Sequence, residues 1–172
     1  MLLFKKLIFL FLSLSLFGSC SYNSNLDNFR GLDVSDSLSN IHIITKNKRT
    51  HQIARFELEK IFNSLNSYNS SKNLKYSLDF NIEESISGNI LSTSLSTMTF
   101  NVSFTLTENS NNREIFHDEF KIISSFGSLE SLYGKEQAQK NTANKLSISS
   151  ATEIYFRLRY FFSSLKHKNE TK

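Results

Sequence analysis

The sequence predicts an α+β fold, a two-layer α/β sandwich in which a mixed sheet of about four strands is covered by two helices. Two observations predict it. Three segments alternate apolar and polar residues with a period of two, and two others carry apolar residues at helical spacing. The expected order is strand, helix, three strands, helix, or β-α-β-β-β-α. Strands with one apolar face need cover, and the two amphipathic helices supply it.

The first strand and the first helix are expected at residues 38–45 and 50–65. A short β-branched run at 41–44 is typical of a strand. Thr50 then precedes apolar residues at three- and four-residue steps, and it is a suitable N-cap for the helix. The turn-forming segment 66–71 ends this helix.

Three further strands are expected at residues 74–82, 98–106 and 115–123. The first two alternate strictly, which indicates one buried and one wet face. The stretch 83–95 is less regular and is interpreted as a hairpin turn with an irregular edge. A long helix over residues 135–165 closes the domain. Its stripe recurs at helical spacing and consists of Ala143, Leu146, Ser150, Ile154, Leu158, Phe161 and Leu165.

The N-terminus has the pattern of a secretory signal. Two lysines precede an apolar run at 7–17, which is shorter than the ~20 residues that span a bilayer. Cys20, the only cysteine of the chain, directly follows Gly18 and Ser19. This placement resembles the lipobox of bacterial lipoproteins, in which the thiol is acylated and becomes the new N-terminus. An ordinary signal peptide with an incidental cysteine is the alternative.

The chain is therefore divided into four segments. These are a lipoprotein signal peptide (1–19), the lipidated cysteine with a tether (20–37), the folded domain (38–168) and a polar tail (169–172). Without the signal, 18 basic and 16 acidic side chains remain, a net charge of +2. So small a charge does not favour nucleic acid as a partner. Ser21 rather than aspartate follows the cysteine, which in typical lipoproteins favours the outer membrane. We therefore expect a lipid anchor in the outer membrane, with the domain facing the periplasm.

No catalytic or metal-binding pattern is found in the sequence. It contains no Gly-x-Ser-x-Gly turn, no His-Glu-x-x-His and no Cys-x-x-Cys, and its 5 glycines are too widely spread for a phosphate loop. The adjacent acids at 83–84 and 118–119 would point to opposite faces of a strand. His42 and His117 are expected on the wet face. We therefore expect no enzyme, no metal and no cofactor.

One cluster of charges is a candidate binding site. Lys46, Lys48 and Arg49 fall together in the loop between the first strand and the first helix, and Arg55 can project from the following turn. Such a cluster can hold phosphate or carboxylate groups through charge-assisted hydrogen bonds. A solvated loop is the simpler interpretation of the same residues.

Several segments, taken in order, carry a resemblance to a known family. Residues 28–32 read Asn-Phe-Arg-Gly-Leu, similar to a Gly-Phe-Arg-Pro-Leu segment that follows the lipidated cysteine in that family. Residues 74–80 match its Tyr-x-Leu-x-hydrophobic strand, and the segments 124–134 and 154–158 resemble its closing element. On these motifs the chain resembles a divergent, short member of the LPS-assembly lipoprotein family LptE.

The resemblance implies a partner role in the Gram-negative outer membrane. LptE-like lipoproteins plug the β-barrel LptD, assist its assembly and help lipopolysaccharide reach the outer leaflet. The implied partners are therefore an LptD-like barrel and lipopolysaccharide, with Lys46, Lys48 and Arg49 as candidate contacts for either. The alternative function is that of a lipid-anchored periplasmic binding or adaptor module of another envelope transport system.

Overall fold

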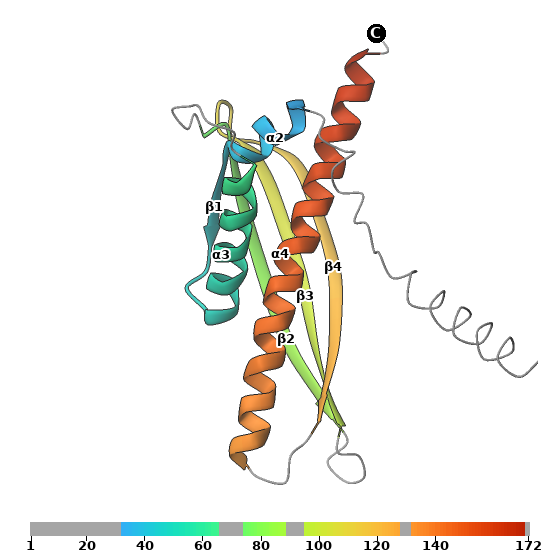
Figure 1. The fold of residues 1–172 in the computed structure, drawn as a ribbon. Helices are drawn as coiled ribbons and strands as arrows, with labels where there is room; N and C mark the ends of the chain where they lie inside the picture. The colour runs from blue at the N-terminus through green and yellow to red at the C-terminus, as the bar shows by residue number, and fades with distance from the viewer. Residues whose placement is uncertain (1–31, 66–73, 89–94, 128–131, 171–172) are drawn as a thin grey trace, which may run out of the picture. The chain divides into compact units, whose positions relative to one another are not determined.

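The fold is organised by a four-stranded mixed sheet (Figure 1). Its strands are β1 (Ile41–Thr45), β2 (Tyr76–Gly88), β3 (Leu95–Glu108) and β4 (Arg113–Gly127), and they lie in this order across the sheet. β1 is parallel to β2, whereas β2–β3 and β3–β4 are antiparallel. The structure is a computed structural model and describes residues 32–65, 74–88, 95–127 and 132–170.

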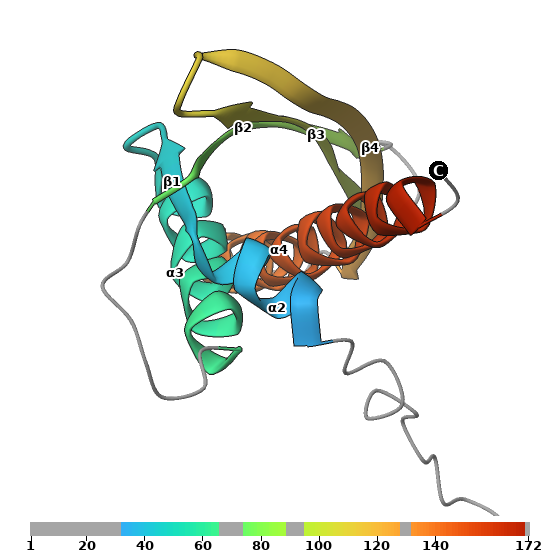
Figure 2. The same cartoon turned by 90° about the horizontal axis from the view of Figure 1, so that it is seen from above.

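Three helices accompany the sheet: α2 (Leu32–Ser39), α3 (Arg49–Ser64) and α4 (Leu132–Glu170). Helices α3 and α4 lie side by side on one face of the curved sheet, as Figure 2 shows. α4 covers β3 and β4, and α3 packs on β1 and α4. The predicted α+β sandwich, with a mixed four-stranded sheet, is therefore confirmed.

The core forms where the alternating strands turn their apolar side chains toward the helices. Phe80 lies opposite Phe104, and Ile82 lies opposite Val102, so the apolar residues of neighbouring strands share one face. Among the helices, the middle of α4 contributes most to this core, and its Ile154 is fully buried. The buried residues of the two central strands are Leu78, Phe80, Ile82, Met98, Phe100, Val102, Phe104 and Leu106.

The prediction for residues 32–45 is wrong in part. A tether was expected up to residue 37 and a strand over 38–45, but Leu32–Ser39 form helix α2 and the strand begins at Ile41. Leu38 is only 1% exposed and Val34 packs against the core, so burial of these two side chains draws the segment into the domain. The folded unit accordingly begins at Leu32 rather than at residue 38.

Two element ends also differ from the prediction. The N-cap of α3 is Lys48, in extended conformation and without a side-chain cap, whereas Thr50 lies inside the first turn. The irregular stretch expected at 83–95 is instead strand up to Gly88 and again from Leu95. After Ile82, β2 carries polar side chains on both faces, so its sequence no longer alternates between apolar and polar residues. Its backbone nevertheless still pairs with β3.

The stripe predicted for the last helix is correct in its centre and wrong at its end. Leu158 is fully buried, but Leu165 is 43% exposed. The next inward residue after Leu158 is Phe162, one position beyond the predicted Phe161. Phe161 is partly buried and stacks on Phe116 of β4, with ring centroids 4.5 Å apart.

Some predictions concern residues outside the described part of the chain. The signal peptide, Cys20 and the tether up to residue 31 are among them, as is the turn at 66–71. The predicted polar tail falls partly in α4, which runs to Glu170.

Candidate functional site

The three predicted binding residues lie together at the start of α3. Lys46 follows β1, Lys48 is the N-cap of α3 and Arg49 is its first residue, and all three side chains are exposed. The Nζ of Lys46 donates a hydrogen bond of 2.8 Å to Oδ1 of Asn81 on β2. This contact ties the loop to the sheet at the point where β1 ends.

No carboxylate of the described residues neutralises the charge of this basic loop. None of the ion pairs within the described residues involves Lys46, Lys48 or Arg49. Arg55, the expected fourth member, instead pairs with Glu59 one turn later at 2.8 Å and does not join the cluster. Three cations on one short loop, with no carboxylate partner in the described part of the chain, can therefore receive an anionic group from another molecule.

His51, which the sequence analysis left without a role, anchors this loop from inside. Its ring is fully buried and stacks on Phe80, with centroids 5.9 Å apart. The Nε2 atom accepts a hydrogen bond of 3.0 Å from the backbone N–H of Ile82. The sequence shows only that His51 lies one helical turn before Arg55. Its hydrogen-bond partner on β2, Ile82, lies 31 residues away in the chain.

The hydrogen bond from Ile82 requires a neutral imidazole ring. Because Nε2 accepts, the ring proton lies on Nδ1, which is buried without a partner among the described residues. Burial lowers the pKa of His51 below its ordinary value of 6.5, and the charges of Lys48 and Lys46 lower it further. The Oδ1 atom of Asn81, which lies 3.5 Å from Nε2 and would accept a hydrogen bond from the protonated ring, acts in the opposite direction, as does the charge of Glu84.

We expect this histidine to make folding pH-dependent. A group whose pKa is lower in the folded state stabilises the fold above its unfolded pKa, and that contribution is lost as the pH falls through the folded pKa. In a His51→Gln variant, the amide can still accept from Ile82 but does not titrate. The stability of the wild type should therefore fall more than that of the variant between about pH 8 and about pH 5. Parallel urea unfolding curves over this range check it, and equal losses would contradict it.

The adjacent acids at 83–84 and 118–119 take different positions. Both Glu83 and Glu84 belong to β2. Glu84 accepts a hydrogen bond of 2.6 Å from the hydroxyl of Thr50, which joins the first turn of α3 to the sheet. Asp118 on β4 faces α4 and forms an ion pair of 2.7 Å with Arg157. These contacts are structural, since they hold the two helices against the sheet.

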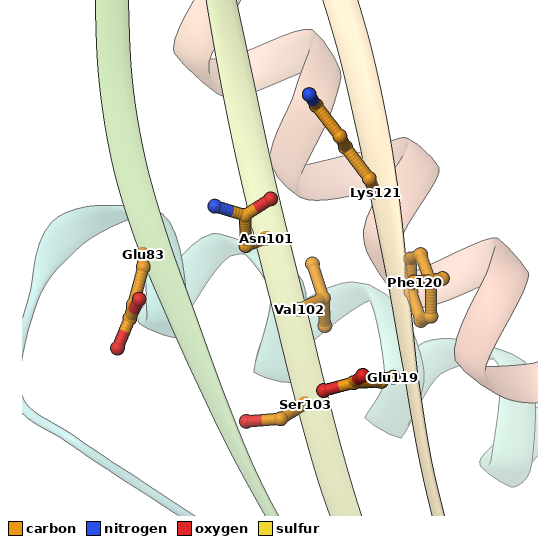
Figure 3. A pocket seen from close by; sticks show the side chains of 7 residues that line it. All are labelled: Glu83, Asn101, Val102, Ser103, Glu119, Phe120 and Lys121. Atoms are coloured by element: carbon orange, nitrogen blue, oxygen red, sulfur yellow. The ribbon is translucent and has the colours of Figure 1, made fainter.

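A shallow depression of about 400 Å³ lies on the outer face of the sheet. Figure 3 shows its polar side chains, which come from three strands: Glu83, Asn101, Ser103, Glu119 and Lys121. In the strand register Glu83, Asn101 and Lys121 form one row across the sheet. Two acids and one base give no clear preference for an anion or a cation, so we assign this depression no ligand.

The remaining predicted residues do not form a site. His42 and His117 are exposed on the wet face, as expected, and Nδ1 of His117 forms a hydrogen bond of 3.0 Å with the hydroxyl of Thr105. Within residues 32–65, 74–88, 95–127 and 132–170, no group of three His, Cys, Asp or Glu side chains could hold a metal ion. In the same ranges, no helix combines the length and the apolar character needed to cross a bilayer.

Comparison with known proteins finds similarity in structure only. No protein-family model matches the sequence, and no curated protein has a significant match. A candidate lipoprotein from Caulobacter crescentus CB15 superposes with a TM-score of 0.63 at 16% identity, covering 76% of this chain and 96% of that one. The chain shares its fold.

Two further solved structures have the same fold. Lipoprotein B from Nitrosomonas europaea has a TM-score of 0.53 at 16% identity, covering 74% of this chain and 86% of that one. The rare lipoprotein B from Shewanella oneidensis has a TM-score of 0.50 at 13% identity, covering 76% of this chain and 98% of that one. These matches extend over most of each protein, so they concern the whole domain.

Proposed function

We propose that this protein is an outer-membrane lipoprotein that plugs an LptD-type β-barrel and assists its assembly. In this role it helps lipopolysaccharide reach the outer leaflet. The observation that carries the proposal is the combination of Cys20 at the end of a signal sequence with a fold shared with proteins named lipoprotein B. The resemblance of the sequence to the LptE family supports the same role.

The anchor fits a protein held permanently at the membrane. Each buried methylene of an acyl chain contributes ~0.8 kcal/mol, and stable anchoring takes more than one such signal. Acylation of Cys20 by several chains meets this requirement. The described domain, beginning at Leu32, then follows the anchor after a short connecting segment.

We assign the basic loop the contact with lipopolysaccharide phosphates or with carboxylates of the barrel. Lys48 and Arg49 are exposed and have no carboxylate partner in the ranges that the structure describes, and Asn81 holds Lys46 in place. Replacing all three by glutamine should weaken binding of either partner, and the loss should be larger at low salt because exposed charges are screened. Binding measurements at two ionic strengths check it, with Arg55→Gln as the control. Equal affinity of the triple variant and the wild type would mean that the loop is solvated surface and not a binding site.

Depletion of the protein tests the proposed function itself. A plug that binds the folded barrel stabilises it by mass action, so the amount of correctly assembled barrel should fall when the plug is removed. The outer membrane should then become permeable to apolar compounds. Barrel levels on immunoblots and uptake of an apolar dye are the measurements. Normal barrel levels together with an intact barrier would refute the proposal.

The alternative is a lipid-anchored adaptor of another envelope transport system. The same anchor and the same domain fit this role, and no described residue excludes it. The two functions differ in the partner that is recovered, because a plug binds a β-barrel and an adaptor of this kind binds an inner-membrane transporter.

A further inference from the structure

Within the described part of the chain, the edge of β2 is unpaired beyond the end of β1. β1 pairs with β2 only from Ile41↔Tyr76 to Thr45↔Phe80, whereas β2 continues to Gly88 against β3. Figure 1 shows β2 running well past the end of β1. Among the described residues, no strand lies beside residues 81–88 on that side of the sheet.

The backbone groups that face this open edge can be identified from three contacts. In each one, an even-numbered residue of β2 bonds to a partner on the β1 side of the strand. The contacts are Tyr76 N–H to Asn40 O at 3.3 Å, Thr45 Oγ1 to Phe80 O at 3.4 Å, and Ile82 N–H to His51 Nε2 at 3.0 Å. Since direction alternates along a strand, Glu84, Ile86 and Gly88 turn their N–H and C=O groups to the same side.

Within the described part of this edge, the only charges that oppose another strand are those of Glu83 and Glu84, and residues 85–88 carry none. Residues 83–88 are all exposed, and they include neither proline nor lysine, the residues that often block sheet edges. Ile86 is 49% exposed on the face that carries the core. An added strand would therefore gain backbone hydrogen bonds and one apolar contact.

An added strand cannot continue past Ile82. The N–H of Ile82 is already bonded to the buried ring of His51, and the basic loop begins at the next position because Lys46 bonds to Asn81. The added chain must end or turn away at this point. Its end would lie beside Lys46, Lys48 and Arg49, which have no carboxylate partner among the described residues.

Charge decides the direction of the added strand. A strand parallel to β2 would bring a positively charged N-terminus to the three cations, whereas an antiparallel strand brings a C-terminal carboxylate. We propose that the β2 edge between Ile82 and Gly88 binds the extended C-terminal segment of a partner protein, antiparallel to β2, with its terminal carboxylate at the basic loop. The binding mode is strand addition with carboxylate capture.

A synthetic peptide tests this mode of binding. The probe is Lys-Val-Thr-Val-Thr-Val with a free carboxylate, titrated onto the full chain in detergent and followed by calorimetry. The peptide's second valine would then lie opposite Ile86. The same peptide with a C-terminal amide should bind about tenfold more weakly, because it loses charge-assisted hydrogen bonds. A version with methylated nitrogens at its valines should also bind more weakly, since it cannot donate to β2.

Two variants separate the edge from the rest of the molecule. Ile86→Pro removes an N–H that faces the open edge and leaves the bonds to β3 in place, so the domain should fold but bind the peptide at least about tenfold more weakly. Ile86→Thr keeps this N–H and is the matched control. Replacing the three loop cations by glutamine should remove the preference for the free carboxylate over the amide. Circular dichroism confirms that each variant is folded.

Hydrogen exchange gives a readout that does not depend on any variant. Peptide binding should slow exchange of the amides of Glu84, Ile86 and Gly88 while leaving Glu83 and Ser85 unchanged. No binding, equal binding of the acid and amide peptides, or protection elsewhere would overturn the proposal. Self-association of the chain that Ile86→Pro abolishes would also overturn it, because a second copy would then be the occupant of the edge.

Discussion

Replacing Phe104 by alanine should lower the free energy of unfolding by about 3–5 kcal/mol. Phe104 is 1% exposed on the central strand β3 and lies opposite Phe80. Its ring also contacts Phe116 and Phe120 of β4 edge to face, at 5.7 and 6.3 Å between centroids. Removal of the ring leaves a cavity between three strands that the rigid sheet cannot close.

The control for this prediction lies on the same strand. Thr99 belongs to the opposite face of β3, and Thr99→Ala should change the stability by no more than about 0.5 kcal/mol. Denaturant unfolding followed by circular dichroism measures both variants. Similar losses for the two variants would mean that the assignment of the buried and wet faces of the sheet is wrong.

Replacing Cys20 by alanine should release the protein from membranes almost completely. The chain has one cysteine, so no other thiol can be acylated at the signal sequence. Loss of every acyl chain removes the anchoring free energy, which rises with each buried methylene. Fractionation and intact-mass measurement detect this result, and Ser19→Ala serves as a control that keeps the thiol.

Membrane partitioning that is the same for Cys20→Ala and the wild type would contradict lipidation. The mass of the wild type must also exceed that of the unmodified mature chain, which begins at Cys20, by the acyl groups. If the acylated wild type is recovered from the inner membrane, the expectation that Ser21 directs the protein to the outer membrane is wrong.

The sequence predicts the strands of this fold better than it predicts their ends. The segments 74–82 and 98–106 alternate because each strand has one face on the core, and such a pattern needs no knowledge of the partner strand. The extension of β2 to Gly88 was missed because Glu83 and Glu84 interrupt the alternation. Those residues remain in the strand because their backbones pair with β3.

Helix α2 was missed for a different reason. Its polar residues are typical of a loop, and among its side chains that the structure describes, the apolar ones that pack on the domain are Val34 and Leu38. An eight-residue helix is too short to be stable alone, so its formation depends on burial of Leu38 against the core. A contact of this kind cannot be read from a local pattern.

In the candidate site, too, features that depend on neighbouring residues were predictable from the sequence, and contacts between distant residues were not. Lys46, Lys48 and Arg49 are neighbours in the sequence, so their grouping on one loop was predictable. Their connection to β2 was not, because the contacts to Asn81, Ile82 and Glu84 join residues 30 to 35 positions apart. His51 is the central residue of these contacts, and a single buried histidine has no signature in the sequence.

The central claim is that this protein is a lipoprotein that binds a β-barrel in the outer membrane. The most direct measurement is co-purification from solubilised membranes with an affinity tag at the C-terminus, using Cys20→Ala as the unanchored control. We predict recovery of a large β-barrel protein in one-to-one ratio with the lipidated chain. Recovery of an inner-membrane ATPase complex and no barrel would contradict the proposed function and support the adaptor role.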